Sequence, residues 1–164
     1  MKSMFAAAAV LALVASPAFA KKMSIPEESP IATVEIPDDW QPNSTDRGAQ
    51  GTSPDNTTYI AIEQVDGTDA KAATEESIKM FAKDGTKIDE SSMKTQDIDI
   101  GGKKGVDITV NGTNKDGPQN MEIVLMPTPS EGKFLLVTYW GTPDGAKANQ
   151  ATLDKIQESL STAE

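Results

Sequence analysis

The chain has 164 residues, 15 lysines and arginines against 25 aspartates and glutamates, and a formal net charge of −10. This acidic excess opposes binding to nucleic acid or anionic membranes, because such affinity depends mainly on basic side chains that neutralise phosphates. Cysteine and histidine are both absent, which excludes disulfides, thiolate or imidazole metal ligands, and Ser–His or Cys–His nucleophile pairs. The charge serves solubility first, although it would also suit a basic partner or cations.

The first twenty residues have the pattern of an export signal. A positive start is followed by an unbroken apolar run over residues 5–15 and by Ala18-Phe19-Ala20, a small-x-small cleavage sequence. This run is shorter than the roughly 20 residues that cross a bilayer, and no later segment is apolar enough to be a membrane anchor. We expect cleavage after Ala20, a periplasmic or secreted product, and a flexible leader over residues 21–31, which contain two prolines and no periodicity.

Residues 32–164 have the pattern of a single domain. A short strand over residues 32–36 ends at Pro37, because proline has no N–H to donate to a sheet ladder. Residues 41–56 consist almost wholly of turn-forming types and predict a long surface loop. Alternating polar and apolar residues over 57–65 then predict another strand.

The second half predicts two hairpins. Residues 87–100 contain a strand that pairs across a turn at 101–105 with the alternating strand 106–110. After a polar turn, strands over 121–126 and 134–140 form the second pair. The last of these strands is apolar on both faces, which indicates a central position in a sheet that is covered on both sides.

Two helices complete the pattern. Apolar residues at helical spacing predict one helix over residues 69–83, with Asp69 as its cap. In the second, Thr142 is suited to the N-cap and Pro143 to the first helical position, and an apolar stripe runs to Leu160. The fold class predicted is α+β, an antiparallel sheet of about six strands with helices packed on it.

In this order, the elements resemble the PsbP-like superfamily, which includes PsbP proteins, Mog-type Ran-binding proteins and exported bacterial proteins of the DcrB type. The resemblance rests on VEIPDDW at 34–40, the acidic helix after the second strand, IGGKKG at 100–105, FLLVTYW at 134–140 and the terminal amphipathic helix. It implies an α/β/α sandwich that works by binding other proteins and is not an enzyme. The metal-associated histidines of plant PsbP proteins have no counterpart here, so metal handling is not implied.

Asp38-Asp39-Trp40 can be interpreted as a site or as a corner of the fold. A pair of carboxylates could serve acid–base chemistry, but adjacent residues in an extended chain point to opposite faces. Trp40 is large enough to fold back over the open end of the core. We therefore expect a corner, with Asp38 and Asp39 facing water.

Two other segments invite a ligand but lack the complete pattern. Asp97 and Asp99 alternate like the first oxygen ligands of an EF-hand, yet Gly101 occupies the third ligand position and the later glutamate is missing. The glycine-rich segment 101–105 lacks the Gly-Lys-Ser/Thr ending of a phosphate-binding loop. We expect no metal site and no cofactor.

Tyr139 and Trp140 lie together at the end of the expected central strand. Aromatic residues there can pack in the core, or they can line a cleft or a partner surface. With the 41–56 loop, and with Asp38 and Asp39, they are the expected docking surface.

Two functions are compatible with these patterns. The first is a non-enzymatic exported protein that binds an unidentified protein partner in the cell envelope. The second is a small-ligand carrier or a carboxylate-dependent enzyme with an Asp/Glu pocket. A deep pocket with two inward-facing carboxylates would favour the second function, and a shallow surface with an exposed apolar patch would favour the first.

Overall fold

The computed structural model describes residues 20–83, 85–100 and 102–162, so nearly all of the expected export signal lies outside the described residues. The chain forms an α+β fold with two antiparallel sheets. Its elements are β1 (Ala20–Ile25), β2 (Ala32–Pro37), the 3-10 turn η1 (Asp38–Trp40), β3 (Asn43–Ser44), β4 (Gly48–Thr52), β5 (Thr58–Asp66), α1 (Ala70–Lys83), β6 (Lys87–Ile100), β7 (Lys103–Asn114), β8 (Gly117–Pro127), β9 (Lys133–Gly141), α2 (Pro143–Ser159) and β10 (Ser161–Thr162).

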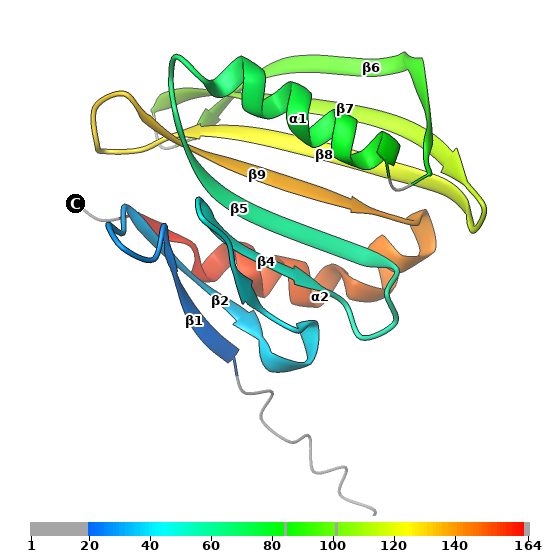
Figure 1. The fold of residues 1–164 in the computed structure, drawn as a ribbon, viewed down its shortest axis with the longest axis horizontal. Helices are drawn as coiled ribbons and strands as arrows, with labels where there is room; N and C mark the ends of the chain where they lie inside the picture. Colours follow the sequence, from blue (N-terminus) through cyan, green and yellow to red (C-terminus); the bar gives the residue numbers. More distant parts are fainter. Residues whose placement is uncertain (1–19, 84, 101, 163–164) are drawn as a thin grey trace, which may run out of the picture.

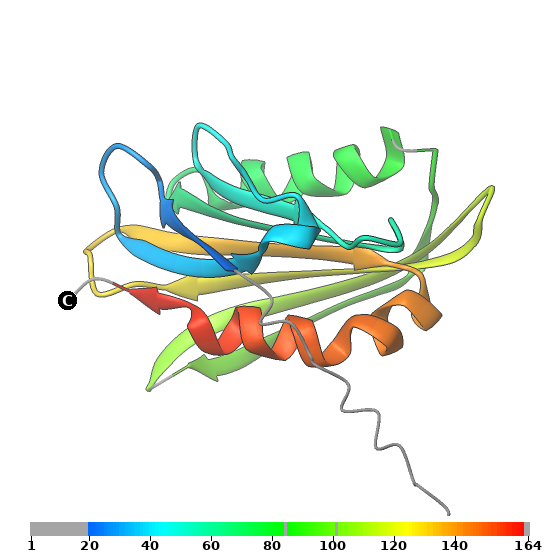
Figure 2. The ribbon, with the colours of Figure 1, turned by 90° about the horizontal axis from the view of Figure 1, so that it is seen from below.

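The main sheet has seven strands in the order β3-β4-β5-β9-β8-β7-β6, one more than the approximate six expected. The small sheet has the order β1-β2-β10. Helix α1 packs on β5, β8 and β9, whereas α2 packs beside β2 on the other face of the main sheet (Figures 1 and 2). The fold is therefore layered, with α1 on one side of the main sheet and with α2 and the small sheet on the other. Within the part of the chain that the structure describes, no helix is both long and apolar enough to cross a membrane.

Strand β9 is the fourth of the seven strands, which confirms the central position predicted from its two apolar faces. Leu135 and Leu136, neighbours in the chain, are both fully buried. Leu135 packs in a cluster with Ile156 of α2, and Leu136 packs in a separate cluster with Phe81 of α1. The central strand thus joins two hydrophobic cores, one on each face of the sheet.

The predicted helices and hairpins are also confirmed. The observed α1 begins one residue after the expected cap Asp69. Thr142 caps α2, with its Oγ1 accepting the N–H of Gly145 at 2.9 Å, and Pro143 is the first helical residue. Strands β6 and β7 pair as expected, as do β8 and β9.

The flexible leader expected over residues 21–31 is wrong for its first part, because residues 20–25 form β1. This strand pairs antiparallel with β2, from Ala20 opposite Pro37 to Ile25 opposite Ala32. Met23 and Ile25 are 2% and 0% exposed, so two side chains two residues apart anchor the strand in the core. Two apolar positions ahead of a proline are too short a pattern to separate a strand from an irregular segment.

The long loop expected over residues 41–56 is also wrong, because this segment contains β3 and β4. Strand β4 pairs with β5 from Gly48 opposite Glu63 to Thr52 opposite Tyr59. A Cβ at Gly48 would collide with the carbonyl oxygen of Ile62, and one at Gly51 would lie 3.0 Å from Ile36 Cγ2. Gly48 thus allows close approach of the neighbouring strand β5, and Gly51 allows close approach of Ile36 and Trp40 on one face of the sheet. An interpretation of glycine as a turn signal misses this role.

The turns in the second half are tighter than expected. Strand β7 begins at Lys103 and continues to Asn114, and β8 begins at Gly117. Only residues 115–116 connect these two strands, because Asn114 already pairs with Gly117. The polar residues at the ends of β7 and β8 resemble a loop sequence, but their backbone groups still pair between the two strands. The sequence therefore predicts a turn that is too long.

Trp40 forms the expected corner. It is 2% exposed and packs in the core between the small sheet and the main sheet, while Asp38 and Asp39 are exposed on η1. Its backbone carbonyl lies against Gly51 of β4. The aromatic side chain therefore closes one end of the core, and the two carboxylates face solvent.

Replacement of Trp40 by alanine is expected to lower the free energy of unfolding by about 3–5 kcal/mol, because it leaves a large cavity in the core. Asp38→Asn and Asp39→Asn should change it by less than about 0.5 kcal/mol, as exposed substitutions usually do. Urea unfolding followed by circular dichroism measures both. A loss for either asparagine variant as large as that for Trp40→Ala would contradict the corner interpretation.

Ile25→Ala should cost about 2–5 kcal/mol if β1 is part of the core, because a buried isoleucine loses both transfer energy and packing. The matched change Lys22→Ala, at an exposed position of the same strand, should have little effect. If both changes have equally small effects on urea unfolding, the interpretation of residues 21–31 as a flexible leader would be supported instead.

Candidate functional site

A groove of about 520 Å³ opens on the α1 side of the main sheet, at the end where β9 meets α2. One wall is the connection between β4 and β5, and the other is the tight turn between β7 and β8. The residues that line it are Thr52, Asp55, Asn56, Thr57, Thr58, Tyr59, Asn114, Asp116, Gln119, Trp140 and Thr142. The groove is therefore built from segments far apart in the chain.

The aromatic part of the groove is a stacked pair, Tyr59 and Trp140. The two residues lie opposite each other in the β5–β9 ladder, and their ring centroids are 3.9 Å apart with planes at 19°. Phe81 of α1 lies against Trp140 at a centroid distance of 6.2 Å. The hydroxyl of Tyr59 donates to Gln50 Oε1 at 2.7 Å. Burial, together with the charge of Glu63, raises the pKa of Tyr59 to about 12, so this phenol remains protonated.

Asp55 organises the first wall. Its Oδ1 accepts from the hydroxyl of Ser53 at 2.5 Å, from the hydroxyl of Thr57 at 2.8 Å and from the N–H of Thr57 at 3.1 Å. These donors lower the pKa of Asp55 to about 2. The loop therefore holds a fixed negative charge at the edge of the groove.

This wall is also tied to the start of α2. The N–H of Thr142 donates to the carbonyl of Thr57 at 3.0 Å. The amide of Asn149 donates to Gly145 O at 3.0 Å and to Thr58 Oγ1 at 3.3 Å. Because the loop is fixed to the sheet and to the helix, the wall is preformed.

Side chains of β7 and β8 form the opposite wall. Asn114 Oδ1 accepts the N–H of Asp116 at 2.9 Å and Nε2 of Gln119 at 3.2 Å. Gln119 is only 6% exposed, and its Oε1 has no hydrogen-bond partner among the described residues. At the tip, Lys115 Nζ lies 2.7 Å from Asp116, although both side chains are largely in solvent.

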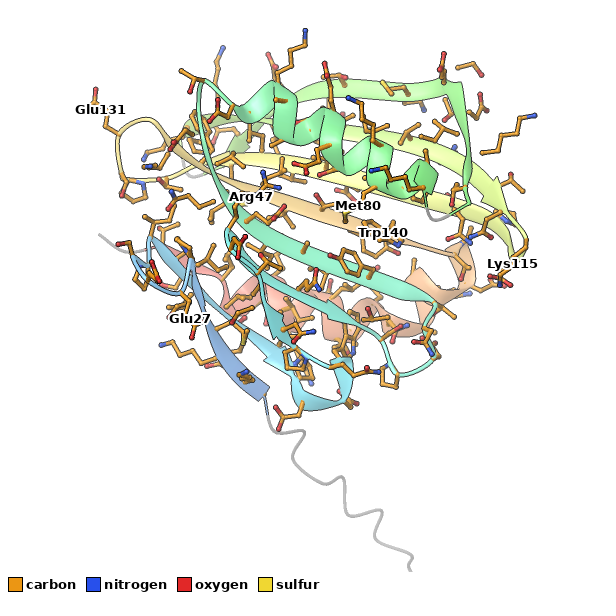
Figure 3. The ribbon with its side chains drawn as sticks, viewed as in Figure 1. Glu27, Arg47, Met80, Lys115, Glu131 and Trp140 are labelled. Carbon is orange, nitrogen blue, oxygen red and sulfur yellow. The ribbon has the colours of Figure 1, made fainter. Side chains whose placement is uncertain are left out.

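A second, smaller hollow of about 200 Å³ runs along the exposed side of α1. Met80, which lines it, is 44% exposed, although it is large and apolar. One turn before Met80, Glu76 also lines this hollow, and Arg47 makes ion pairs of 3.2 Å with both Glu76 and Glu63 of β5. Figure 3 shows Arg47, Met80 and Trp140 along the side of α1 that faces β5. We call Tyr59, Met80 and Trp140 the apolar strip.

The structure separates the residues that the sequence grouped as a docking surface. Trp140 lines the groove, but Tyr139 lies on the opposite face of β9, where its hydroxyl has no partner among the described residues. Desolvation, followed by the charge of Glu122, raises the pKa of Tyr139. Asp38 and Asp39 line neither groove.

Sequence reasoning missed Tyr59, and also Asp116 and Gln119 on the opposite wall of the groove. The sequence places Tyr59 in a strand, but its stacking partner Trp140 is 81 positions further along the chain. Only the strand register decides which residues face each other. Local alternation gives the face of a residue within its own strand and nothing about the strand beside it.

Two carboxylates do lie near each other on the α2 side of the main sheet. Asp107 is 8% exposed; its Oδ2 accepts from Gln96 at 2.7 Å, and its Oδ1 has no partner within the described part of the chain. Desolvation and the nearby charge of Asp107 raise the pKa of Glu122 on the adjacent strand. Neither residue lines the groove or the hollow on α1.

Among the described residues, no group of three or more histidine, cysteine, aspartate or glutamate side chains could hold a metal ion. Asp97 is exposed on β6. Asp99 has a structural role, because its Oδ1 accepts the N–H of Gly102 at 2.9 Å and supports the turn into β7.

Comparison with solved structures finds this fold in proteins of low sequence identity. The cyanobacterial PsbP (CyanoP) from Synechocystis sp. PCC 6803 has a TM-score of 0.57 at 9% identity, over 92% of this chain and 96% of that chain. A protein from Bacteroides thetaiotaomicron has a TM-score of 0.52 at 15% identity, over 87% of this chain and 48% of that chain. The Ran-binding protein Mog1p from Saccharomyces cerevisiae has a TM-score of 0.49 at 10% identity, over 88% and 95%.

The PsbP-like fold expected from the resemblance is thus confirmed. No protein-family model matches the chain, and no curated protein matches it in sequence. At these identities the likeness concerns the fold alone.

The fixed charge of Asp55 should appear in the pH dependence of stability. Its pKa falls from 3.8 to about 2 on folding, so its contribution is present above pH 3.8 and is lost as the pH falls through 2. The melting temperature of Asp55→Asn should therefore be lower than that of the natural protein above this window, and the difference should close within it. Thermal unfolding between pH 2 and pH 6 measures the difference.

Thr57→Val, which removes one donor to Asp55, should reduce the same pH-dependent difference. A difference between Asp55→Asn and the natural protein that stays constant across this pH range would contradict the role given to the Ser53 and Thr57 donors.

Proposed function

We propose that this protein is a non-enzymatic exported protein, periplasmic or secreted, whose single PsbP-like domain, residues 32–164 together with β1, binds another protein of the cell envelope. The observation that carries the proposal is the apolar strip of Tyr59, Met80 and Trp140. Partly exposed aromatic side chains and an exposed methionine on a rigid frame are the residue types that anchor protein interfaces. The frame is rigid because the walls of the groove are tied to the sheet and to α2.

Chemical composition supports a binding role over catalysis. The chain contains neither histidine nor cysteine, so acid–base or nucleophilic chemistry would have to use carboxylates or hydroxyls. General acids and bases work best when their pKa lies near the working pH. The Asp55 carboxylate at the groove, with a pKa of about 2, is a poor proton donor or acceptor near neutrality.

The second function, a small-ligand carrier or a carboxylate-dependent enzyme, is favoured by one observation. Desolvation and the charge of the buried Asp107 raise the pKa of Glu122, and a carboxyl group perturbed in this way is a candidate for acid–base chemistry. However, neither of them lines a described groove. The apolar strip beside the groove, with Met80 44% exposed, therefore supports the binding function better.

The proposed partner surface differs from the expected one in a specific way. It keeps Trp140 and adds Tyr59 and Met80, whereas Tyr139 faces the α2 side of the sheet. Asp38 and Asp39 remain proposed partner contacts outside the groove, because they are exposed on η1, which packs through Trp40 on the small-sheet side of Gly51.

Site-specific photo-crosslinking in cells tests this proposal with a matched control. Met80 on α1 and Met93 on β6 are the exposed large apolar residues, at 44% and 41%. A photoreactive residue at position 80 should give one abundant crosslinked species, identified by mass spectrometry, and the same residue at position 93 should not. Trp140→Ala should weaken the product at position 80.

Identical products at both positions, or none at position 80 in repeated experiments, would contradict binding through the apolar strip. A product that is unaffected by Trp140→Ala would place the partner on the outer side of α1, away from the groove.

A further inference from the structure

The charged side chains that line the groove at the sheet end are all negative. Asp55 and Asp116 lie on its two walls. Among the described residues no lysine or arginine lines it, although Lys115 at the tip of one wall pairs with Asp116 at 2.7 Å. Three donors occupy Oδ1 of Asp55, but Oδ2 receives only the amide of Asn149, at the long distance of 3.4 Å. One carboxylate oxygen of a permanently charged residue is therefore available to a ligand.

Gln119 adds an acceptor on the opposite wall. Its side chain is 6% exposed and its Nε2 donates to Asn114 Oδ1, whereas its Oε1 has no hydrogen-bond partner among the residues described. This oxygen is not one of the fully buried unpaired atoms, so it opens onto the groove that the residue lines. A donor group of a ligand can take the place of solvent there.

The aromatic pair is suited to the same kind of ligand. The faces of tryptophan and tyrosine rings carry negative potential and attract ammonium or guanidinium groups within about 6 Å of the ring centre. Tyr59 and Trp140 both line the groove and are each half-buried. A cation there can contact an aromatic surface and a carboxylate together.

The start of α2, which also borders the groove, offers little to an anion. Pro143 has no N–H, and the N–H groups of Gly145 and Ala146 already donate to Thr142. The usual attraction of a helix N-terminus for anions depends on free N–H groups. The net charge of −10 opposes an anionic ligand further.

We infer that the groove receives a basic side chain, arginine in preference to lysine, from an extended segment of the protein partner. This inference rests on the proposed function and names the chemistry of the partner. Arginine is preferred because its planar guanidinium can stack on an aromatic ring while its fork of N–H donors reaches separate acceptors. Those acceptors are Asp55 Oδ2 and Gln119 Oε1, and a guanidinium can also replace the exposed Lys115 Nζ on the carboxylate of Asp116.

The experiment is a titration of the full protein with short blocked peptides of the form acetyl-Gly-Ser-X-Ser-Gly-amide. The readout is the NMR signal of the Trp140 indole N–H, identified by its loss in Trp140→Phe. With X as arginine the signal should shift saturably, and with X as citrulline, the uncharged isostere, affinity should fall about tenfold or more. The lysine peptide should bind more weakly than the arginine peptide, and the glutamate peptide should not bind.

Variants connect this binding to the groove. Asp116→Asn and Gln119→Leu should each weaken arginine-peptide binding by about three- to tenfold. Asp97→Asn removes the same charge from exposed β6 and should leave the affinity unchanged. Raising the salt from about 0.05 M to about 0.5 M should also weaken binding, because part of the attraction is between exposed charges.

Equal binding of the arginine and citrulline peptides, or equal effects of Asp116→Asn and Asp97→Asn, would overturn the inference. If crosslinking from position 80 succeeds and no arginine peptide binds, the protein-binding function stands and the basic ligand is wrong. If the peptide binds as expected and position 80 gives no crosslink, the envelope partner is wrong and the groove recognises basic groups from another source.

Discussion

The burial of β9 on both faces is the constraint on which the rest of the structure depends. A strand with apolar side chains on both faces, such as Leu135 and Leu136, is stable only if a layer covers each side of the sheet. Helix α1 covers one face, and α2 with the small sheet covers the other. The strand therefore fixes where the two helices lie and makes the fold a layered sandwich.

The candidate site lies where this coverage ends. Beyond Thr138, which is buried beneath α1 and bonded to Ser77, the strand continues to Trp140 at the margin of the helix. Its side chain is partly buried, and its ring stacks on Tyr59 because β5 is paired to β9 in a single register. The groove is thus a consequence of the same packing that forms the core. The connections β4–β5, β7–β8 and β9–α2 border it.

The two faces of the sheet also differ in their polar chemistry. On the α1 side, the groove presents acceptors, among them a carboxylate held charged by hydroxyl and amide donors. On the α2 side, Glu122 has a raised pKa near the buried Asp107. The first arrangement favours attraction of a cation, whereas the second favours exchange of a proton. Because the exposed apolar side chains lie on the α1 side, the acceptors of the groove are a better guide to function than the pair of Glu122 and Asp107.

The sequence by itself determined the elements whose signal is local. The double apolar character of residues 134–140, the cap at Thr142 and the corner at Trp40 each follow from a few adjacent residues, and each is present in the structure. Tertiary structure alone decided that residues 20–25 join a sheet, that Gly48 belongs to a strand, and that Tyr59 meets Trp140. The reason is that alternation and capping are properties of neighbouring residues, whereas register and close approach depend on which distant strands pair and how closely the layers pack.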